Sequence, residues 1–294
     1  MTTLKALLDG PEIVLAPGVY DGLSARLVEE AGFKAAYLSG ASLCYTRFAL
    51  PDIGLLSMSE VADALGAIRE RATIPLVVDI DTGFGNALNV QRTVRDFESR
   101  GASALQLEDQ VTPKRCGHLA DKAVIPTLEM VGKIKAALDA RASAKTLIIA
   151  RTDAIAVEGF EAALERAHAY AAAGADLLFV EAPPSREHLA VLGRRFGGNA
   201  RLMANMVEGG KTPILAASEL QALGFNLVIY PGGTVRALAA TLRAYFASLR
   251  AHGTTDPFRD RMLDFDALNR IIGTEEFLAR GRLYDAGGEG AKKP

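Results

Sequence analysis

The sequence predicts a (β/α)8 barrel of the TIM type, followed by additional C-terminal helices. Eight short apolar segments recur along the chain, and a stretch with helical periodicity separates each from the next. Gly32, Gly101, Gly174 and Gly224 each lie just past a helical stretch and shortly before an apolar segment, as left-handed C-caps of a reused βα unit would. This alternation implies parallel strands joined by crossover helices, and eight such units in about 240 residues match the size of the barrel.

The predicted strands share a near-continuous apolar run, as expected for a parallel sheet that helices cover on its outer face. In chain order they cover residues 12–18, 35–40, 75–81, 104–109, 146–153, 177–182, 202–206 and 226–231. Between them, segments such as residues 159–174 repeat apolar residues at three and four positions, which is typical of amphipathic helices. A doubly wound open sheet is the alternative, but the number of strands and the lack of G-x-G-x-x-G after the first one disfavour it.

The domain organisation follows from where this alternation stops. We expect the barrel to cover residues 1–250 and a C-terminal helical extension to cover residues 251–284, because the break "AHGTTDP" separates a further helical segment at 257–281. The extension must pack on the barrel or on a neighbouring subunit. Residues 285–294 are polar and glycine-rich, so we predict a disordered tail there.

Composition narrows the class of ligand. A formal net charge of −2 and the lack of Lys/Arg runs beyond short pairs argue against nucleic acid and anionic membranes as partners. No stretch of 18 apolar residues and no signal sequence are found, which predicts a cytoplasmic protein without a membrane segment. The two cysteines form neither a disulfide framework nor a zinc motif. A small-molecule ligand is therefore expected.

Polar side chains follow the predicted strands at their carboxyl ends, which meet at one mouth of a barrel. They are Ser39, Gly40, Asp79, Asp81, Glu108, Asp109, Arg151, Asp153, Glu181 and Asn205. Asp79 and Asp81 lie two apart in one predicted strand and so point to one side, beside Glu108 on the next strand. Each acid alone could be a helix N-cap, but acids at four strand ends favour a cation, and oxygen ligands favour Mg²⁺ or Mn²⁺.

A cysteine lies in the polar loop that follows Glu108. Cys116 stands among the neighbours Lys114, Arg115, Gly117 and His118. Nearby cations lower the pKa of a thiol, and a thiol serves as proton donor or as nucleophile depending on its partners. A lone cysteine is more often structural, which is our interpretation of Cys44, but this setting favours catalysis by Cys116.

Taken together, these segments resemble the isocitrate lyase and phosphoenolpyruvate mutase superfamily, and within it the 2-methylisocitrate lyase and 2,3-dimethylmalate lyase branch. The resemblance spans about residues 12–250 and rests on "YLSGASLCYTRFALPD", "VVDIDTGFGN", "LEDQVTPKRCGH", "IIARTDA", "FVEAP" and "NMVEGGKTP". It implies Mg²⁺-dependent cleavage of a 2-hydroxy di- or tricarboxylate. The products would be pyruvate or glyoxylate and a carboxylate such as propionate or succinate.

The resemblance also implies roles for individual residues. Asp79 would bind Mg²⁺ directly, and Asp81, Asp52 and Glu108 would hold its water ligands. Cys116 would be the proton donor on a mobile loop, with Lys114, His118, Arg151 and Glu181 as further catalytic residues. The substrate would contact Tyr37, Ser39, Gly40, Ala41, Arg115, Gly117 and Asn205.

Alternative functions stay open from the sequence. Some relatives with this cysteine loop hydrolyse oxaloacetate, whereas phosphonate mutases and oxaloacetate decarboxylases generally lack it. A Schiff-base aldolase using Lys114 or Lys211, and a barrel that binds a dicarboxylate without catalysis, are the other candidates. Known members exchange their last helix between subunits, so the resemblance implies a homotetramer built from helix-swapped dimers.

Overall fold

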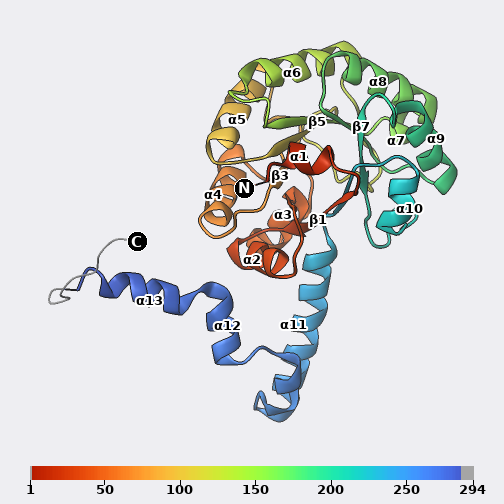
Figure 1. The fold of residues 1–294 in the computed structure, drawn as a ribbon. Helices are drawn as coiled ribbons and strands as arrows, with labels where there is room; N and C mark the ends of the chain where they lie inside the picture. The colour runs from red at the N-terminus through yellow and green to blue at the C-terminus, as the bar shows by residue number, and fades with distance from the viewer. Residues whose placement is uncertain (1, 286–294) are drawn as a thin grey trace. The chain divides into compact units, whose positions relative to one another are not determined.

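Eight parallel strands close into a barrel in the computed structural model, which describes residues 2–285 (Figure 1). The strands are β1 (Val14–Val19), β2 (Ala36–Leu38), β3 (Leu76–Asp79), β4 (Ala104–Glu108), β5 (Leu147–Thr152), β6 (Leu177–Val180), β7 (Arg201–Asn205) and β8 (Leu227–Tyr230). Each strand pairs with the next, and β8 pairs with β1. The predicted (β/α)8 barrel is confirmed.

Helices lie around the strands, and the first of them covers one end of the barrel (Figure 1). They are α1 (Leu4–Leu8), α2 (Gly22–Glu30), α3 (Gly40–Phe48), α4 (Met58–Arg69), α5 (Ala87–Ser99), α6 (Thr127–Ala140), α7 (Ile155–Glu158), α8 (Phe160–Ala172), α9 (Arg186–Phe196) and α10 (Ala217–Ala222), followed by α11 (Gly233–His252). Several start where a side chain caps the first turn: Asp21, Ser57 and Asn86 each accept hydrogen bonds from backbone N–H groups of their helix.

Two apolar cores hold the barrel together. One lies between the strands and the surrounding helices and includes Leu65, Phe97 and Met130. The other fills the barrel interior, where Leu4 and Leu8 of α1 pack with inward-facing strand residues. Because α1 covers this interior core and the polar strand ends lie at the opposite, carboxyl end, the chemistry is confined to that end.

The glycines predicted as helix C-caps adopt left-handed backbone conformations. The φ angles are 84° at Gly32, 92° at Gly101, 100° at Gly174 and 95° at Gly224. A side chain is strained at such φ values, whereas glycine is not. The prediction that a glycine ends the helix of each of these βα units is therefore confirmed.

The C-terminal part of the chain forms a separate unit. The division falls between Arg236 and Ala237, inside α11, whereas the sequence placed the end of the barrel at residue 250. The predicted segment at 257–281 forms η1 (Asp256–Arg261), α12 (Phe265–Ile272) and α13 (Thr274–Arg282). The predicted tail at 285–294 lies outside the described residues, apart from Asp285.

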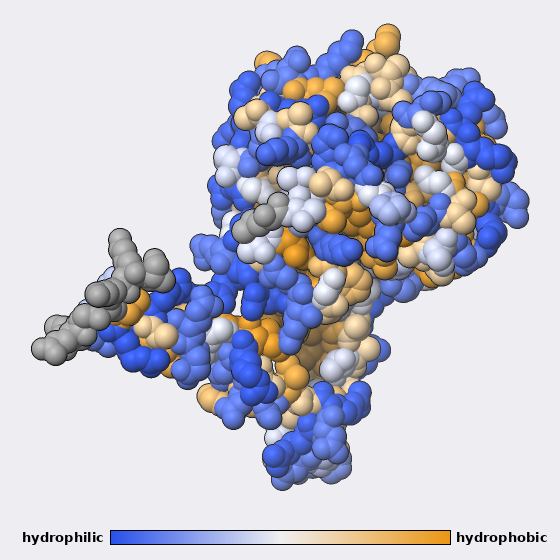
Figure 2. Space-filling model, viewed as in Figure 1, coloured by the Kyte–Doolittle hydropathy of each residue, from blue (hydrophilic) through white to orange (hydrophobic). Residues whose placement is uncertain are grey.

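Apolar side chains are exposed along this C-terminal unit (Figure 2). Phe265 is 83% exposed, and Leu268, Ile272 and Phe277 are also exposed. Contiguous exposed apolar surface is typical of a protein–protein contact. Within residues 2–285, no helix combines the length and the apolar character needed to span a membrane.

Candidate active site

Two aspartates converge beside the first turn of α3 at the mouth. Asp79 is the last residue of β3, but Asp81 lies in the following turn with a φ of 47°, so the prediction that both lie in one strand was wrong. The turn still brings the carboxylates together: a Cβ atom placed on Gly40 would lie 3.3 Å from Asp79 Oδ2 and 3.6 Å from Asp81 Oδ1. A larger residue than glycine would crowd both acids.

A hydrogen-bond chain in the barrel interior orients Asp79. Gln106 donates from Nε2 to Asp79 Oδ1 over 3.1 Å, and the Tyr37 hydroxyl donates to Gln106 Oε1 over 2.6 Å. Gln106 was not among the predicted site residues, although an amide inside the apolar run of β4 was a signal. Tyr37, predicted as a substrate contact, thus has its hydroxyl engaged inside the barrel.

Lys114 lies among the acids of the mouth. Its ammonium nitrogen is 2.6 Å from Asp52 Oδ1 and 2.9 Å from Asp81 Oδ1, and all three side chains are buried. Burial raises the pKa of Asp81 to about 6, and the nearby Asp79 carboxylate adds to the rise while Lys114 opposes it. Lys114 therefore neutralises only part of the negative charge of Asp52, Asp79 and Asp81.

Glu108, the last residue of β4, leaves a buried oxygen without a partner. Within residues 2–285, neither of its two carboxylate oxygens receives a hydrogen bond, although Oε2 lies 3.3 Å from Arg151 Nη1. Burial raises the pKa of Glu108 well above its usual value. An unsatisfied buried acceptor is costly, and a water on a bound cation would satisfy it.

The acids therefore fit a hydrated Mg²⁺ ion. Among the described residues, no three Asp, Glu, His or Cys side chains form a ready-made ligand group. Mg²⁺ in proteins usually keeps several waters, so buried carboxylates can act on it through water as well as directly.

The first turn of α3 faces the same acids with backbone donors. Ser39 is the N-cap and accepts a hydrogen bond from the Ser42 N–H, while Gly40 and Ala41 begin the helix. The first N–H groups of a helix have no acceptor inside it, so this turn can bind an anionic oxygen. A carboxylate bound here would lie beside Asp79 and Asp81.

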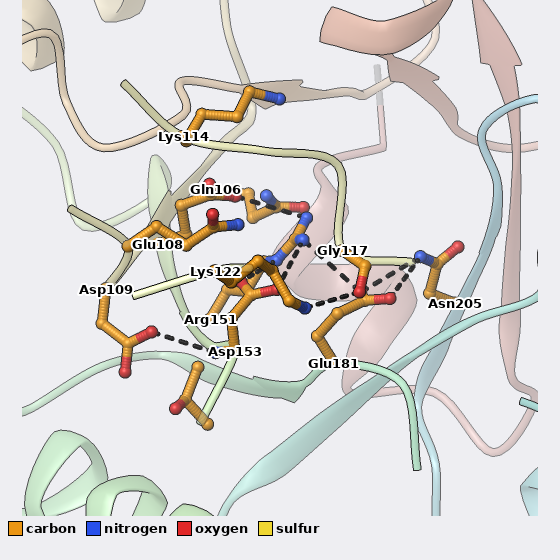
Figure 3. A network of polar contacts seen from close by, with 12 residues as sticks. Gln106, Glu108, Asp109, Lys114, Gly117, Lys122, Arg151, Asp153, Glu181 and Asn205 are labelled. Carbon is orange, nitrogen blue, oxygen red and sulfur yellow. Dashed lines mark hydrogen bonds and ion pairs between the residues drawn. The ribbon is translucent and has the colours of Figure 1, made fainter. Parts of the chain in front are cut away.

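Arg151, on β5, is surrounded by three carboxylates (Figure 3). Its Nε and Nη2 donate to Asp153 over 2.9 and 3.2 Å. Nη1 lies 3.3 Å from Glu108 Oε2, and Nη2 lies 3.8 Å from Glu181 Oε2. The guanidinium thus has a fixed plane and is available to a substrate oxygen only along its remaining edge.

Glu181 receives contacts from Asn205 and His118. Asn205 Nδ2 donates to Oε2 over 3.2 Å, and His118 Nε2 lies 3.2 Å from Oε1. The His118 Nδ1 atom accepts a hydrogen bond from the Lys211 N–H, so the imidazole proton is on Nε2. Burial lowers the pKa of His118, which favours the neutral ring.

Residues 111–123, which we call the lid, leave the barrel after β4 and return before α6. A short antiparallel bridge between Gln110 and Val124 closes its base. Gln110 also binds the lid backbone at Arg115, accepting from its N–H and donating to its carbonyl. The amide of Cys116 donates to the Asp52 carbonyl over 3.0 Å. The lid is therefore docked on the mouth in this structure.

The thiol of Cys116 is kept in its protonated form. Burial raises the pKa of Cys116 above the ordinary value of a thiol. The two neighbouring cations predicted to lower this pKa are directed elsewhere: Lys114 pairs with Asp52 and Asp81, and Arg115 lies toward solvent near Asp121. A protonated thiol suits a proton donor better than a nucleophile.

Arg115 is not brought to the mouth, which corrects its predicted contact with substrate. Its side chain is 47% exposed, and Nη1 donates to the Ala120 carbonyl and lies 3.4 Å from Asp121 Oδ2. Successive side chains of an extended loop point to opposite sides, so burial of Lys114 turns Arg115 toward solvent.

The side chain of Asp109 lies in a buried hydrogen-bond network with α8 and not in the mouth. It accepts hydrogen bonds from the Tyr170 hydroxyl over 2.7 Å and from the Asp153 N–H over 2.9 Å. Arg166 Nη1 lies 3.3 Å from Asp109 and donates to the Ile125 carbonyl just beyond the lid. This buried network holds the base of the lid against α8.

Comparisons with known proteins identify the family of the chain. A family model described as phosphoenolpyruvate phosphomutase matches residues 4–250. The chain is 41% identical over 284 residues to 2,3-dimethylmalate lyase of Eubacterium barkeri, with 97% of this chain and 98% of that protein covered. It is 44% identical over 277 residues to 2-methylisocitrate lyase of Aeropyrum pernix, with 94% and 88% covered.

Solved structures of related proteins have the same fold. A crystal structure of 2,3-dimethylmalate lyase, titled a PEP mutase/isocitrate lyase superfamily member, has a TM-score of 0.90 at 33% identity, covering 100% of both chains. Oxaloacetate acetylhydrolase with 3,3-difluorooxalacetate has a TM-score of 0.90 at 33% identity, covering 98% and 97%. Phosphonopyruvate hydrolase with oxalate and Mg²⁺ has a TM-score of 0.85 at 32% identity, covering 96% and 97%. The chain therefore belongs to the phosphoenolpyruvate mutase/isocitrate lyase superfamily and is a carbon–carbon lyase within it.

Proposed function

We propose that this protein is a Mg²⁺-dependent lyase for a 2-hydroxy di- or tricarboxylate of the 2,3-dimethylmalate or 2-methylisocitrate type. It would release pyruvate or glyoxylate and a carboxylate such as propionate or succinate. The observation that carries this proposal is the position of Cys116 on a lid docked over buried carboxylates. Burial raises the pKa of its thiol, as suits a proton donor. Similarity to the two named lyases supports the substrate class.

The substrate would be bound through its carboxylates and hydroxyl group. The first turn of α3, at Ser39 to Ala41, offers backbone donors to the carboxylate next to the hydroxyl. Arg151 offers a guanidinium, and Asn205 offers a buried amide oxygen, Oδ1, that has no hydrogen-bond donor in the described residues. Lid closure would exclude water from the reacting atoms.

The metal would be held by Asp79 directly and by Asp81, Asp52 and Glu108 through water. Bound Mg²⁺ would supply Lewis-acid chemistry at the substrate hydroxyl and its adjoining carboxylate. Because Lys114 pairs with Asp52 and Asp81, its ammonium must share these acids with the ion or move aside. Mn²⁺ would be the alternative ion, given the oxygen ligands.

The bond changes need one proton acceptor and one proton donor. The substrate hydroxyl would give its proton to a carboxylate of the mouth. The C2–C3 bond then breaks, so C2 becomes the carbonyl carbon of the oxo acid and the electron pair passes to C3. The carboxylate on C3 delocalises this charge. Cys116 then gives its S–H proton to C3, which completes the second product and leaves a thiolate that solvent reprotonates after opening of the lid.

Hydrolysis of oxaloacetate is the second candidate, and one comparison favours it. The oxaloacetate acetylhydrolase structure is as similar in fold as the lyase structure, with a TM-score of 0.90 for each. Release of oxalate and acetate from oxaloacetate, without oxo-acid release from any 2-hydroxy acid, would select this candidate.

Removal of the metal should abolish turnover. EDTA should stop oxo-acid release, and added Mg²⁺ or Mn²⁺ should restore it. Glu108→Gln should weaken Mg²⁺ binding about 10–100-fold, as loss of an outer hydrogen-bonding partner does. Calorimetry of Mg²⁺ binding checks this, with the exposed Glu161→Gln as the matched control. Activity in excess EDTA, with borohydride trapping of substrate on Lys114 or Lys211, would instead establish the Schiff-base mechanism.

We further propose a homotetramer in which the C-terminal helices are exchanged between subunits. The apolar residues exposed on α12 and α13 support this proposal. Light scattering should give four times the chain mass of 31.2 kDa. Phe265→Glu with Phe277→Glu should lower the mass, whereas Leu128→Glu, equally exposed but on the barrel, should not. A monomeric native chain would refute the assembly.

A further inference from the structure

We infer that Lys122 is a positioning residue that ties the lid to the carboxylate shared with Arg151, and so sets the place of Cys116. This inference rests on the proposed function, because it assigns the step of lid closure in that reaction. Lys122 is the last charged residue of the lid, six positions after Cys116.

The ammonium group of Lys122 joins two parts of the molecule (Figure 3). It donates to Asp153 Oδ1 over 2.8 Å and to the carbonyl oxygen of Gly117. The Lys122 side chain is 1% exposed and that of Asp153 is 0% exposed. A buried ammonium is stable only where such partners replace its water, so the contact exists only while the lid is docked.

Asp153 serves Lys122 and Arg151 together. Its Oδ1 accepts from both Lys122 and Arg151 Nη2, and its Oδ2 accepts from Arg151 Nε. Although burial favours the neutral acid, Arg151 and Lys122 hold the pKa of Asp153 at about 2. A single carboxylate thus aligns a barrel guanidinium with a lid ammonium.

The second contact of Lys122 falls where the lid fits tightly against the barrel. A Cβ atom on Gly117 would lie 2.6 Å from Arg151 Nη2 and 2.6 Å from Glu181 Cγ. By holding the Gly117 carbonyl, Lys122 fixes the peptide unit between Gly117 and His118, one residue beyond Cys116. The thiol is therefore placed by a residue that does not touch the reacting atoms.

Loss of the Lys122 ammonium should open the lid without removing the rest of the site. Asp153 keeps its bidentate pairing with Arg151, and Asp52 keeps its pairing with Lys114. The Gly117 carbonyl loses its donor, so the lid should sample undocked positions more often. A small displacement of a reacting group lowers the rate strongly, so kcat should fall about 10–100-fold with a smaller change in KM.

Hydrogen exchange of the full-length protein tests the inference independently of turnover. Backbone exchange in residues 111–123 is measured with Mg²⁺ and oxalate for the native protein, Lys122→Met and Lys122→Arg. The control is Lys135→Met, an exposed lysine on α6. We expect at least about 10-fold faster exchange in the lid of Lys122→Met, unchanged exchange in the barrel strands, and partial recovery in Lys122→Arg.

Native-like exchange in the lid of Lys122→Met, or native kcat, would overturn the inference. Equal acceleration of exchange throughout the barrel would also overturn it, because Lys122 would then be purely structural. If Lys122→Met does not fold, Lys122→Gln provides the same comparison. Should the native protein cleave none of the proposed acids, the exchange data still decide the role of Lys122 in lid docking, and only the proposed function fails.

Discussion

Cys116→Ala should reduce kcat by about a thousandfold or more, within the range that general acid catalysis contributes. The reason is chemical, because the variant can still bind Mg²⁺ and substrate but cannot protonate the carbon released by cleavage. Folding should be unaffected, since the hydrogen bond that docks this part of the lid uses the Cys116 amide and the Asp52 carbonyl. Cys116→Ser should also be impaired, because a hydroxyl is a much weaker acid than a thiol. A coupled assay for oxo-acid release gives both rates.

Cys44 provides the matched control. It is buried on α3, and its thiol donates to the Pro51 carbonyl over 3.3 Å, outside the mouth. Cys44→Ala should therefore lower the free energy of unfolding and leave kcat close to the native value. Native turnover by Cys116→Ala, with its Mg²⁺ affinity intact, would eliminate the thiol as the proton donor.

Gly117→Ala should reduce kcat about 100-fold, because the new methyl group cannot be accommodated by a docked lid. Its Cβ would be 2.6 Å from Arg151 Nη2, and both Arg151 and Glu181 are fixed by buried ion pairs. The lid would then stand away from the barrel and carry Cys116 with it. Steady-state kinetics, combined with hydrogen exchange of the lid, measures the effect.

Gly132→Ala is the control for this substitution. Gly132 lies inside α6, and a Cβ atom placed there would lie in open space. Alanine at an open helical position stabilises a protein by about 0.4–1 kcal/mol. We expect a slightly higher melting temperature and native kcat. A native rate for Gly117→Ala would mean that catalysis does not need the docked lid.

The fold could be predicted from the sequence because its signals are local. Each strand appears as an apolar run, and glycines such as Gly32 and Gly174 mark the helix ends with the positive φ angles that only glycine adopts readily. The converging acids at Asp79 and Glu108 could be predicted as well, since barrel topology alone brings strand ends together.

The finer geometry of the site depends on contacts between distant residues. Asp81 leaves the strand through a turn at positive φ, although Gly83 and Gly85 just after it already indicated a loop. Lys122 and Asp153 are 31 positions apart, and Gln106 and Asp79 are 27 apart. Arg115 was misassigned because the sequence does not state which of two adjacent cations faces the barrel. These details follow from the docking of the lid, which only the assembled structure describes.

Oxo-acid release from a panel of 2-hydroxy di- and tricarboxylates, in the presence of Mg²⁺, tests the central claim most directly. The panel includes 2,3-dimethylmalate, 2-methylisocitrate and isocitrate, and lactate dehydrogenase reports the pyruvate or glyoxylate formed. We expect oxo acid and partner carboxylate in equal amounts from at least one of these acids, formed about a thousandfold or more slowly by Cys116→Ala. Binding of the acids without oxo-acid release from any of them would contradict it.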